Sequence, residues 1–160
     1  VRMSLELQQA FGLRREEAIK FIPSFADRGD HIRLKSTWTK GGKERDVPVR
    51  TDEQSAVLKR AHQLVGNGAL IPSDRNYVQQ LRVYERQTAN AGLSKLHGLR
   101  HAYAQARYEE LTGWKAPAAG GPIARVLSPG QKVMDRQARR TISQELGHIR
   151  EQISSVYVGR

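Results

Sequence analysis

Apolar positions along the chain recur mostly at the three- and four-residue spacing of a helix. The runs with this spacing cover residues 1–10, 14–21, 51–65, 73–90, 98–111, 134–146 and 150–158. Gly12 separates the first two runs, and Gly113 and Gly147 follow two of the later ones, where glycine commonly ends a helix. Thr51 is followed three residues later by Gln54, the capping box that begins many helices. The pattern therefore predicts a mainly helical fold.

Two short runs, residues 32–38 and 45–49, have the pattern of extended strands instead. The sequence Lys40-Gly41-Gly42-Lys43 lies between them, and its glycines permit the positive φ of a tight turn. We expect a β-hairpin with Lys40 beside its tip. The predicted fold class is thus mainly α with a small antiparallel β-sheet (α+β).

Residues 114–132 have neither pattern. They hold three of the six prolines, several glycines and few bulky apolar residues, so we expect a surface loop insertion. The chain starts at Val1, within a helical pattern and without an initiating Met, and Tyr157 lies three residues before its end. At this length we expect residues 1–160 to be one domain, excised from a longer protein.

The charge of the chain is strongly positive, with 27 Lys and Arg against 16 Asp and Glu, a formal net charge of +11. This favours a polyanionic partner, and nucleic acid is the default, with a merely soluble basic protein as the alternative. The absence of cysteine excludes disulfides, cysteine-ligated zinc and thiol catalysis. No apolar run is long enough to span a membrane and no signal peptide is recognisable, so we expect a cytoplasmic protein.

Candidate chemistry is concentrated after residue 96. His97 and Arg100 are three residues apart on one helix face, so one phosphate can contact both. Tyr157 supplies a hydroxyl that can attack a phosphodiester. Taken singly, each candidate has a structural alternative: Arg100 as an ordinary residue of a basic helix, His148 as a cap for terminal carbonyls, and Tyr157 as an aromatic anchor.

Two cations in the first half of the chain are weaker candidates. Arg14 begins a helix, where a cation opposes the helix dipole, and this mildly favours an anion-holding role over an ordinary solvated arginine. Lys40 has two equally good interpretations, a solvated turn lysine or a side chain that reaches into a groove.

The spacing of His97 and His101, four residues apart, also suits a zinc site. Gly98 stands where a zinc protease has Glu, however, and no cysteine or acidic third ligand is nearby. We therefore expect no metal. His97, at the helix start, is the better site candidate, whereas His101 is flanked by apolar residues and supports the site at most.

Five motifs along the chain together resemble those of the tyrosine recombinases, the phage integrase family. They are Gly12-Leu13-Arg14-Arg15-Glu16-Glu17-Ala18, Thr39-Lys40-Gly41-Gly42-Lys43-Glu44-Arg45, His97-Gly98-Leu99-Arg100-His101, Leu146-Gly147-His148, and Tyr157 nine residues after His148. The resemblance spans essentially the whole chain, and the ending is especially similar to integrases of phages and bacterial integrative elements. It implies the tyrosine recombinase catalytic-domain fold and site-specific recombination of DNA belonging to a mobile genetic element.

The resemblance also implies a nucleophile and the residues that surround the scissile phosphate: Tyr157, with Arg14, Lys40, His97, Arg100 and His148. The two arginines would hold the non-bridging oxygens, and His148 would add one more donor. Lys40 would protonate the leaving 5′ oxygen, and His97 would exchange the tyrosine proton. No cofactor is implied, because transesterification through a 3′-phosphotyrosyl intermediate conserves the bond energy.

The implied partners are a double-stranded DNA attachment site and, on that DNA, further copies of the full-length protein in a tetramer. We expect that this chain lacks the family's amino-terminal core-binding domain and the tail after the tyrosine, and that the isolated domain is monomeric. From Arg100 to His148 the chain runs 48 residues, longer than compact members of the family lead us to expect, and the excess falls in residues 114–132.

Three alternatives remain from the sequence. The first is a DNA-binding relative that no longer cuts, which the intact set of six candidate residues disfavours. The second is a type IB topoisomerase, which uses related chemistry to relax supercoils without a partner site. The third is RNA binding, disfavoured because the 2 Trp, 5 Tyr and 3 Phe form no clustered stacking motif.

Overall fold

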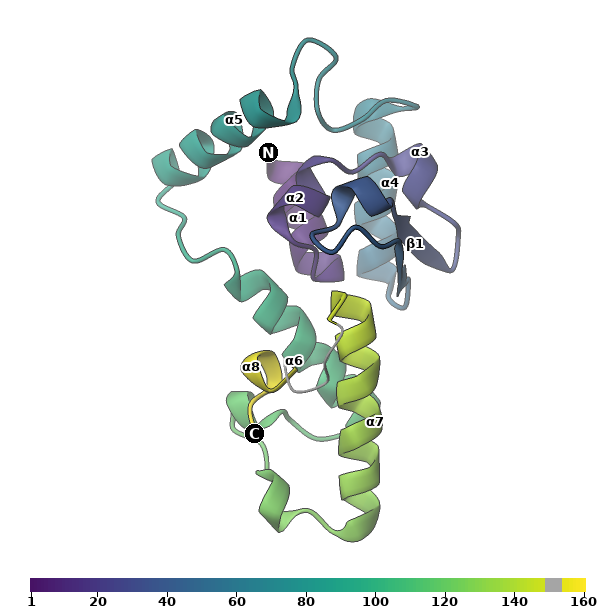
Figure 1. The fold of residues 1–160 in the computed structure, drawn as a ribbon, viewed down its shortest axis with the longest axis vertical. Coiled ribbons are helices and arrows are strands. Elements are labelled where there is room, and N and C mark those ends of the chain that lie inside the picture. The colour runs from purple at the N-terminus through teal and green to yellow at the C-terminus, as the bar shows by residue number, and fades with distance from the viewer. Residues whose placement is uncertain (149–153) are drawn as a thin grey trace.

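Helices dominate the structure, a computed structural model that describes residues 1–148 and 154–160. In chain order the elements are α1 (Arg2–Phe11), α2 (Arg15–Ile19), α3 (Pro23–Ala26), β1 (His31–Leu34), η1 (Ser36–Trp38), β2 (Arg45–Pro48), α4 (Asp52–Val65), α5 (Tyr77–Asn90), α6 (Gly98–Thr112), η2 (Pro117–Ala119), η3 (Ala124–Val126), α7 (Pro129–Leu146) and α8 (Ser154–Val158). The three η elements are short 3-10 helices. The fold is mainly α with a small antiparallel sheet, as the sequence predicts (Figure 1).

The sheet is the expected hairpin of β1 and β2. Its strands pair antiparallel with Ile32 opposite Val47, and both side chains are fully buried. The first extended run is shorter than expected because η1 follows it and turns Trp38 inward. The Trp38 ring lies 5.9 Å from that of Phe21 and 5.7 Å from that of Phe25, centroid to centroid. Burying this large aromatic ring outweighs continuing the strand.

Several predicted helix ends agree with the structure. The Gln54 backbone N–H donates to Thr51 Oγ1 at 3.1 Å, which completes the capping box at the start of α4. Gly12, Gly113 and Gly147 follow α1, α6 and α7 with φ of 68°, 88° and 78°. Glycine adopts this left-handed conformation without the cost that a side chain incurs.

Two helices begin elsewhere than expected. α7 begins at Pro129, earlier than the expected start near residue 134, and Ser128 Oγ caps it by accepting from the Gln131 N–H at 3.2 Å. Ser128, Pro129 and Gln131 are a capping box with proline at the first helical position, a signature hidden among the prolines and glycines around it. α5 begins at Tyr77 and not at residue 73, capped by Asn76.

The shorter helices also differ from expectation. The predicted helix over residues 14–21 is confined to α2, and α3 is an additional helical turn that begins at Pro23. Of the helix expected over residues 150–158, the structure describes the part that α8 covers, and the rest lies outside the described residues.

α1 packs against α2, α4 and α6. A Cβ added at Gly12 would lie 2.6 Å from Tyr103 Cδ1, so the end of α1 and α6 approach closely only because this residue is glycine. α6 then extends downward from α1 to pack on α7 and α8, as Figure 1 shows. The core is therefore continuous from the hairpin to the tyrosine helix, and α6 joins its two parts.

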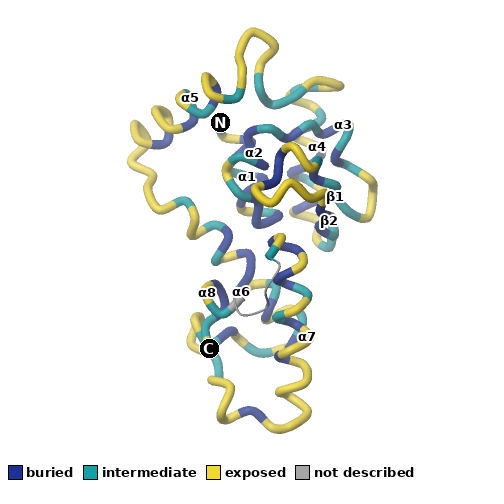
Figure 2. Tube along the Cα trace, in the orientation of Figure 1, coloured by how far each residue is buried: buried dark blue, intermediate teal, exposed yellow. Residues whose placement is uncertain are grey.

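α5 projects from this body as an arm (Figure 1) and is largely exposed, as Figure 2 shows. Its buried side chains are Gln80, Tyr84 and Thr88, along one face. The Tyr84 hydroxyl donates to Gln8 Oε1 at 2.8 Å and connects the arm to α1. Among residues 1–148 and 154–160, no helix has both the length and the apolar composition needed to cross a membrane.

Candidate active site

Tyr157 lies inside a cluster of histidines. Its hydroxyl is 3.0 Å from His97 Nε2, hydrogen-bond distance, and the residue is only 5% exposed. Its ring centroid lies 4.5 Å from that of His101, 5.3 Å from that of His148 and 5.6 Å from that of His97. The structure thus brings residues from α6, α8 and the end of α7 to one place.

Arg100 is fully buried beside this cluster and contacts both halves of the core. Its Nη1 donates to the Gly12 carbonyl at 2.7 Å and its Nη2 to the Leu146 carbonyl at 2.9 Å. Its guanidinium carbon lies 5.5 Å from the centre of the Tyr157 ring. A guanidinium has five N–H donors, and Arg100 Nε has no partner within the described part of the chain. Donors therefore remain for an anion.

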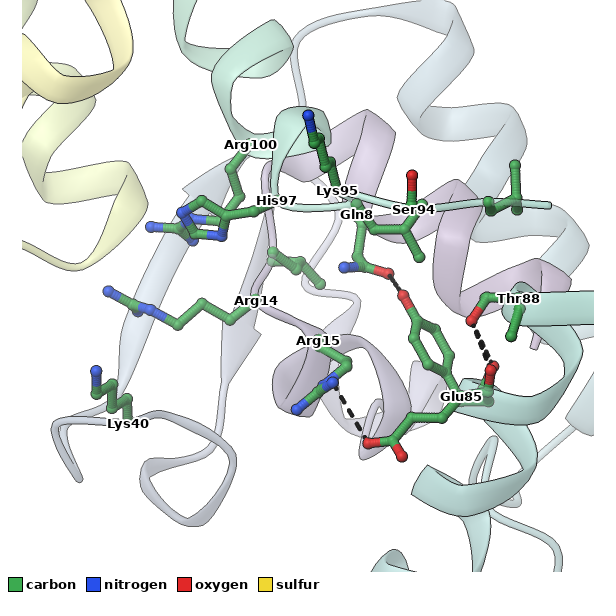
Figure 3. A pocket seen from close by; sticks show the side chains of 15 residues that line it. Gln8, Arg14, Arg15, Lys40, Glu85, Thr88, Ser94, Lys95, His97 and Arg100 are labelled. Carbon is green, nitrogen blue, oxygen red and sulfur yellow. Dashed lines mark hydrogen bonds and ion pairs between the residues drawn. The ribbon is translucent and has the colours of Figure 1, made fainter.

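Arg14 and Lys40 approach the same region from the hairpin side. Both line a cavity of about 580 Å³ together with His97 and Arg100. Figure 3 shows Arg14, His97 and Arg100 extending to the same side of the cavity, with Lys40 on the hairpin turn nearby. Arg14 also borders a second cavity of about 190 Å³ with His148. Five of the six predicted residues therefore line one or both of these cavities, and Tyr157 is connected to them through its contact with His97.

The two histidines beside Arg100 favour their neutral form. Burial, with the positive charges of Arg100 and Arg14, lowers the pKa of His148 to about 4. The pKa of His97 is also lowered, first by burial and then by the charges of Arg100, His101 and Arg14. A neutral imidazole can accept a proton, so His97 is suited to take the one on the Tyr157 hydroxyl.

A buried ion pair behind the site has no counterpart in the sequence prediction. Glu17 is fully buried and accepts from Arg45 Nη1 at 2.6 Å and from Arg45 Nη2 at 2.8 Å. It also accepts from the Arg14 backbone N–H at 2.8 Å. Burial raises the pKa of Glu17, but the Arg45 hydrogen bonds and the charges of Arg45 and Arg14 outweigh it, so the pKa is lowered.

Arg45 also ties the hairpin to the end of α7. Its Nε donates to the Glu145 carbonyl at 2.8 Å, and the Glu145 carboxylate in turn accepts from the Tyr103 hydroxyl at 2.5 Å and from Arg107 Nε at 3.1 Å. The sequence does hold one indication: Arg45 occupies the same face of its strand as buried Val47, where a charge needs a partner.

His101 is closer to the centre than the sequence suggests, because its ring contacts both Tyr157 and His97. His101 belongs to α6 and packs against the Tyr157 ring from that helix. Within residues 1–148 and 154–160, histidine, aspartate and glutamate form no group of three that could hold a metal ion.

Comparison with known families identifies the chain. The model of the integrase family matches residues 1–106, which include Arg14, Lys40, His97 and Arg100. The chain belongs to the integrase family of tyrosine recombinases. A comparison of this integrase chain with curated proteins finds no match.

Two solved structures resemble the fold of this integrase chain. One is the XerH site-specific recombinase bound to palindromic difH substrate in a post-cleavage complex, with 20% identity, a TM-score of 0.57, and coverage of 98% of this chain and 41% of that one. The other is XerH bound to difH substrate in a pre-cleavage complex, with 20% identity, a TM-score of 0.55, and coverage of 98% and 42%. The integrase chain thus spans about two fifths of their length.

Proposed function

We propose that this integrase chain is the catalytic domain of a site-specific recombinase that cleaves and rejoins double-stranded DNA through a 3′-phosphotyrosyl intermediate. The observation that carries the proposal is the 3.0 Å contact between His97 Nε2 and the Tyr157 hydroxyl, next to the buried guanidinium of Arg100. A nucleophile, a neutral base and a fixed cation lie together in one place. That set suits attack on a phosphodiester.

Arg100 and Arg14 bind the scissile phosphate in this proposal. Their planar guanidinium groups donate to the two non-bridging oxygens and neutralise the charge that accumulates in the pentavalent transition state. Arg100 is held by two backbone carbonyls before DNA arrives, so little reorganisation is needed at the moment of reaction. His148, stacked on the Tyr157 ring, donates to the same phosphate.

The chemical step exchanges one phosphodiester for another. Tyr157 Oη forms a bond to phosphorus while the bond from phosphorus to the 5′ oxygen breaks, and the hydroxyl proton passes to His97. Lys40 gives a proton to the departing 5′ oxygen, which leaves as a free hydroxyl. The reverse of these steps rejoins the strand, so the residues of this chain need no cofactor to balance the reaction.

The proposed partner is a DNA attachment site bound by several copies of the full-length protein. The two XerH structures are described as bound to difH substrate, and their fold matches this chain over nearly its whole length. The net charge of +11 supports contacts to the phosphate backbone, so DNA affinity should fall steeply as salt rises. We propose a tetramer on DNA for the full-length protein and a monomer for this domain alone.

A suicide duplex tests the proposed reaction. The duplex carries the protein's own attachment sequence with a nick beside the cleavage position, so that the released fragment diffuses away and the adduct accumulates. The full-length protein should give a covalent protein–DNA band in denaturing gels, and Tyr157→Phe should give none. A full-length protein that binds the duplex and forms no adduct would establish a non-cutting relative, and plasmid relaxation by the monomer would indicate topoisomerase activity.

A further inference from the structure

The helix that carries Tyr157 depends on its packing for its position. The described part of α8 covers five residues, and helices shorter than about 12 residues are only marginally stable in isolation. The place of the Tyr157 hydroxyl must therefore be set by what α8 packs against. Among the described residues three elements do this: α6, which already carries His97 and Arg100, α7, and η2 in the segment that follows α6.

Residues 114–121, which contain η2, form a tightly closed turn that we call the platform. The backbone N–H groups of Ala119 and Gly121 both donate to the Ala116 carbonyl, each at 2.9 Å, and Ala116 is fully buried. A Cβ added at Gly121 would lie 1.7 Å from the Lys115 carbonyl oxygen. The turn therefore closes this tightly only with glycine at position 121, and it presents a fixed backbone surface.

The residues directly after Tyr157 lie on this surface. Val158 is fully buried. Gly159 has φ of 89°, and a Cβ added there would lie 2.7 Å from the Ala118 backbone nitrogen and 3.2 Å from Pro117 Cβ. Contact between two backbones at this distance leaves no room for a side chain. The platform and the end of α8 thus fit each other closely.

A second contact holds the Tyr157 backbone from the α6 side. Gln105 Nε2 donates to the Tyr157 carbonyl at 3.1 Å. Gln105 lies two turns along α6 from His97, so the helix that carries the phosphate-binding Arg100 also carries a donor to the nucleophile's backbone. The helix that carries the tyrosine thus contacts α6, α7 and the platform.

We propose that the platform, with Gln105, positions Tyr157 for attack, so that the segment after α6 serves the reaction by fixing where the nucleophile lies. This rests on the proposed function. The platform touches neither the phosphate nor the reacting oxygen, and its residues are positioning residues. Its contribution is alignment: a displacement of about 1 Å of a reacting group costs roughly 10²-fold in rate.

A pair of glycines allows a matched test. Gly159 and Gly29 both have a φ of 89°, so alanine strains the backbone similarly at each. A Cβ at Gly29, which lies outside the platform, meets nothing within 4 Å among the described residues, whereas one at Gly159 meets the platform. Gly159→Ala should therefore displace the end of α8, and Gly29→Ala provides the control for strain alone.

The measurement is the single-turnover rate of adduct formation on the nicked duplex described above, with DNA affinity measured separately in the same full-length variants. We expect Gly159→Ala to lower the rate by roughly 10²-fold while the Kd for DNA stays within about twofold. Gly29→Ala should stay close to the unmodified protein in both. Equal rates for the two alanine variants, or a rate loss fully explained by weaker DNA binding, would overturn the proposal.

Gln105→Leu provides a second variant if Gly159→Ala fails to fold. It removes the donor to the Tyr157 carbonyl and keeps the side-chain size, so we expect a loss of about tenfold in rate with unchanged DNA affinity. An unchanged rate would count against the proposal. Failure of the unmodified protein to form any adduct would instead reject the proposed function, so the two failures are distinguishable.

Discussion

Arg100 has two roles that share one guanidinium. Two of its N–H groups hold the Gly12 and Leu146 carbonyls together, and its other donors lie beside the Tyr157 ring. Its burial, with the nearby charge of Arg14, lowers the pKa of Arg100 to about 10, which leaves it charged at neutral pH. The residue therefore maintains a buried positive charge at the point where a phosphate would bind.

The histidines beside Arg100 should make the fold sensitive to acid. His148 has a pKa of about 4 in the folded protein and an ordinary value near 6.5 when unfolded. Between these values the unfolded chain binds a proton that the folded chain does not, so stability falls as pH falls through this window. His97 shifts in the same direction.

We therefore expect the Tm to fall between about pH 7 and about pH 5, above the range in which carboxylates titrate. His148→Asn removes one of the responsible imidazoles and should reduce the fall. Thermal unfolding followed by circular dichroism at a series of pH values measures it. A fall equally steep in His148→Asn would show that this imidazole does not cause the acid sensitivity.

The proposed role of Lys40 can be tested by changing the leaving group of the reaction. Because Lys40 donates a proton to the departing 5′ oxygen in this proposal, Lys40→Ala should slow adduct formation by roughly 10²- to 10⁴-fold. A duplex with sulfur in place of that bridging oxygen needs no proton to leave, so it should react at similar rates with Lys40→Ala and with unmodified protein. If the sulfur substrate leaves the defect of Lys40→Ala intact, Lys40 acts in binding and not as the acid.

At the scale of elements, the Glu17–Arg45 pair joins α2 to β2 and, through the Glu145 carbonyl, to the end of α7. Removing one partner leaves a buried charge uncompensated, which typically costs about 3–5 kcal/mol. Glu17→Gln should therefore lower the free energy of unfolding by about that amount, and denaturant unfolding measures it.

The double variant Glu17→Gln with Arg45→Met removes both charges and should recover part of the lost stability. Each single variant provides the comparison for the double one. Strictly additive losses in the double variant would show that the two side chains do not interact energetically in the folded protein.

The elements whose ends carry local signatures were predictable from the sequence, and those set by tertiary contacts were not. Thr51 with Gln54 and the glycines after α1, α6 and α7 define boundaries within a few residues of chain. The 3-10 turn at Trp38 depends on distant aromatic rings at Phe21 and Phe25, which no local pattern reveals. The early start of α7 had a signature at Ser128, but the composition of its neighbours masked it.

At the scale of the whole molecule, the candidate site joins two parts of the fold. Arg14 and Lys40 come from the α2 and hairpin side, whereas His97, Arg100 and Tyr157 come from α6 and α8. The six candidate residues follow from motif order in the sequence. The charged residues that support them are harder to predict. Glu17 and Glu145 look like ordinary surface charges until the fold shows them buried, and Arg45 is indicated only by the face of its strand.

The most direct test of the central claim is to identify the residue and the DNA end that become joined. The adduct from the nicked duplex is digested with protease and nuclease, and the modified peptide is sequenced by mass spectrometry. We predict a nucleotide joined through its 3′ phosphate to Tyr157, with a free 5′ hydroxyl on the released strand. A link to another residue, or through a 5′ phosphate, would contradict the account.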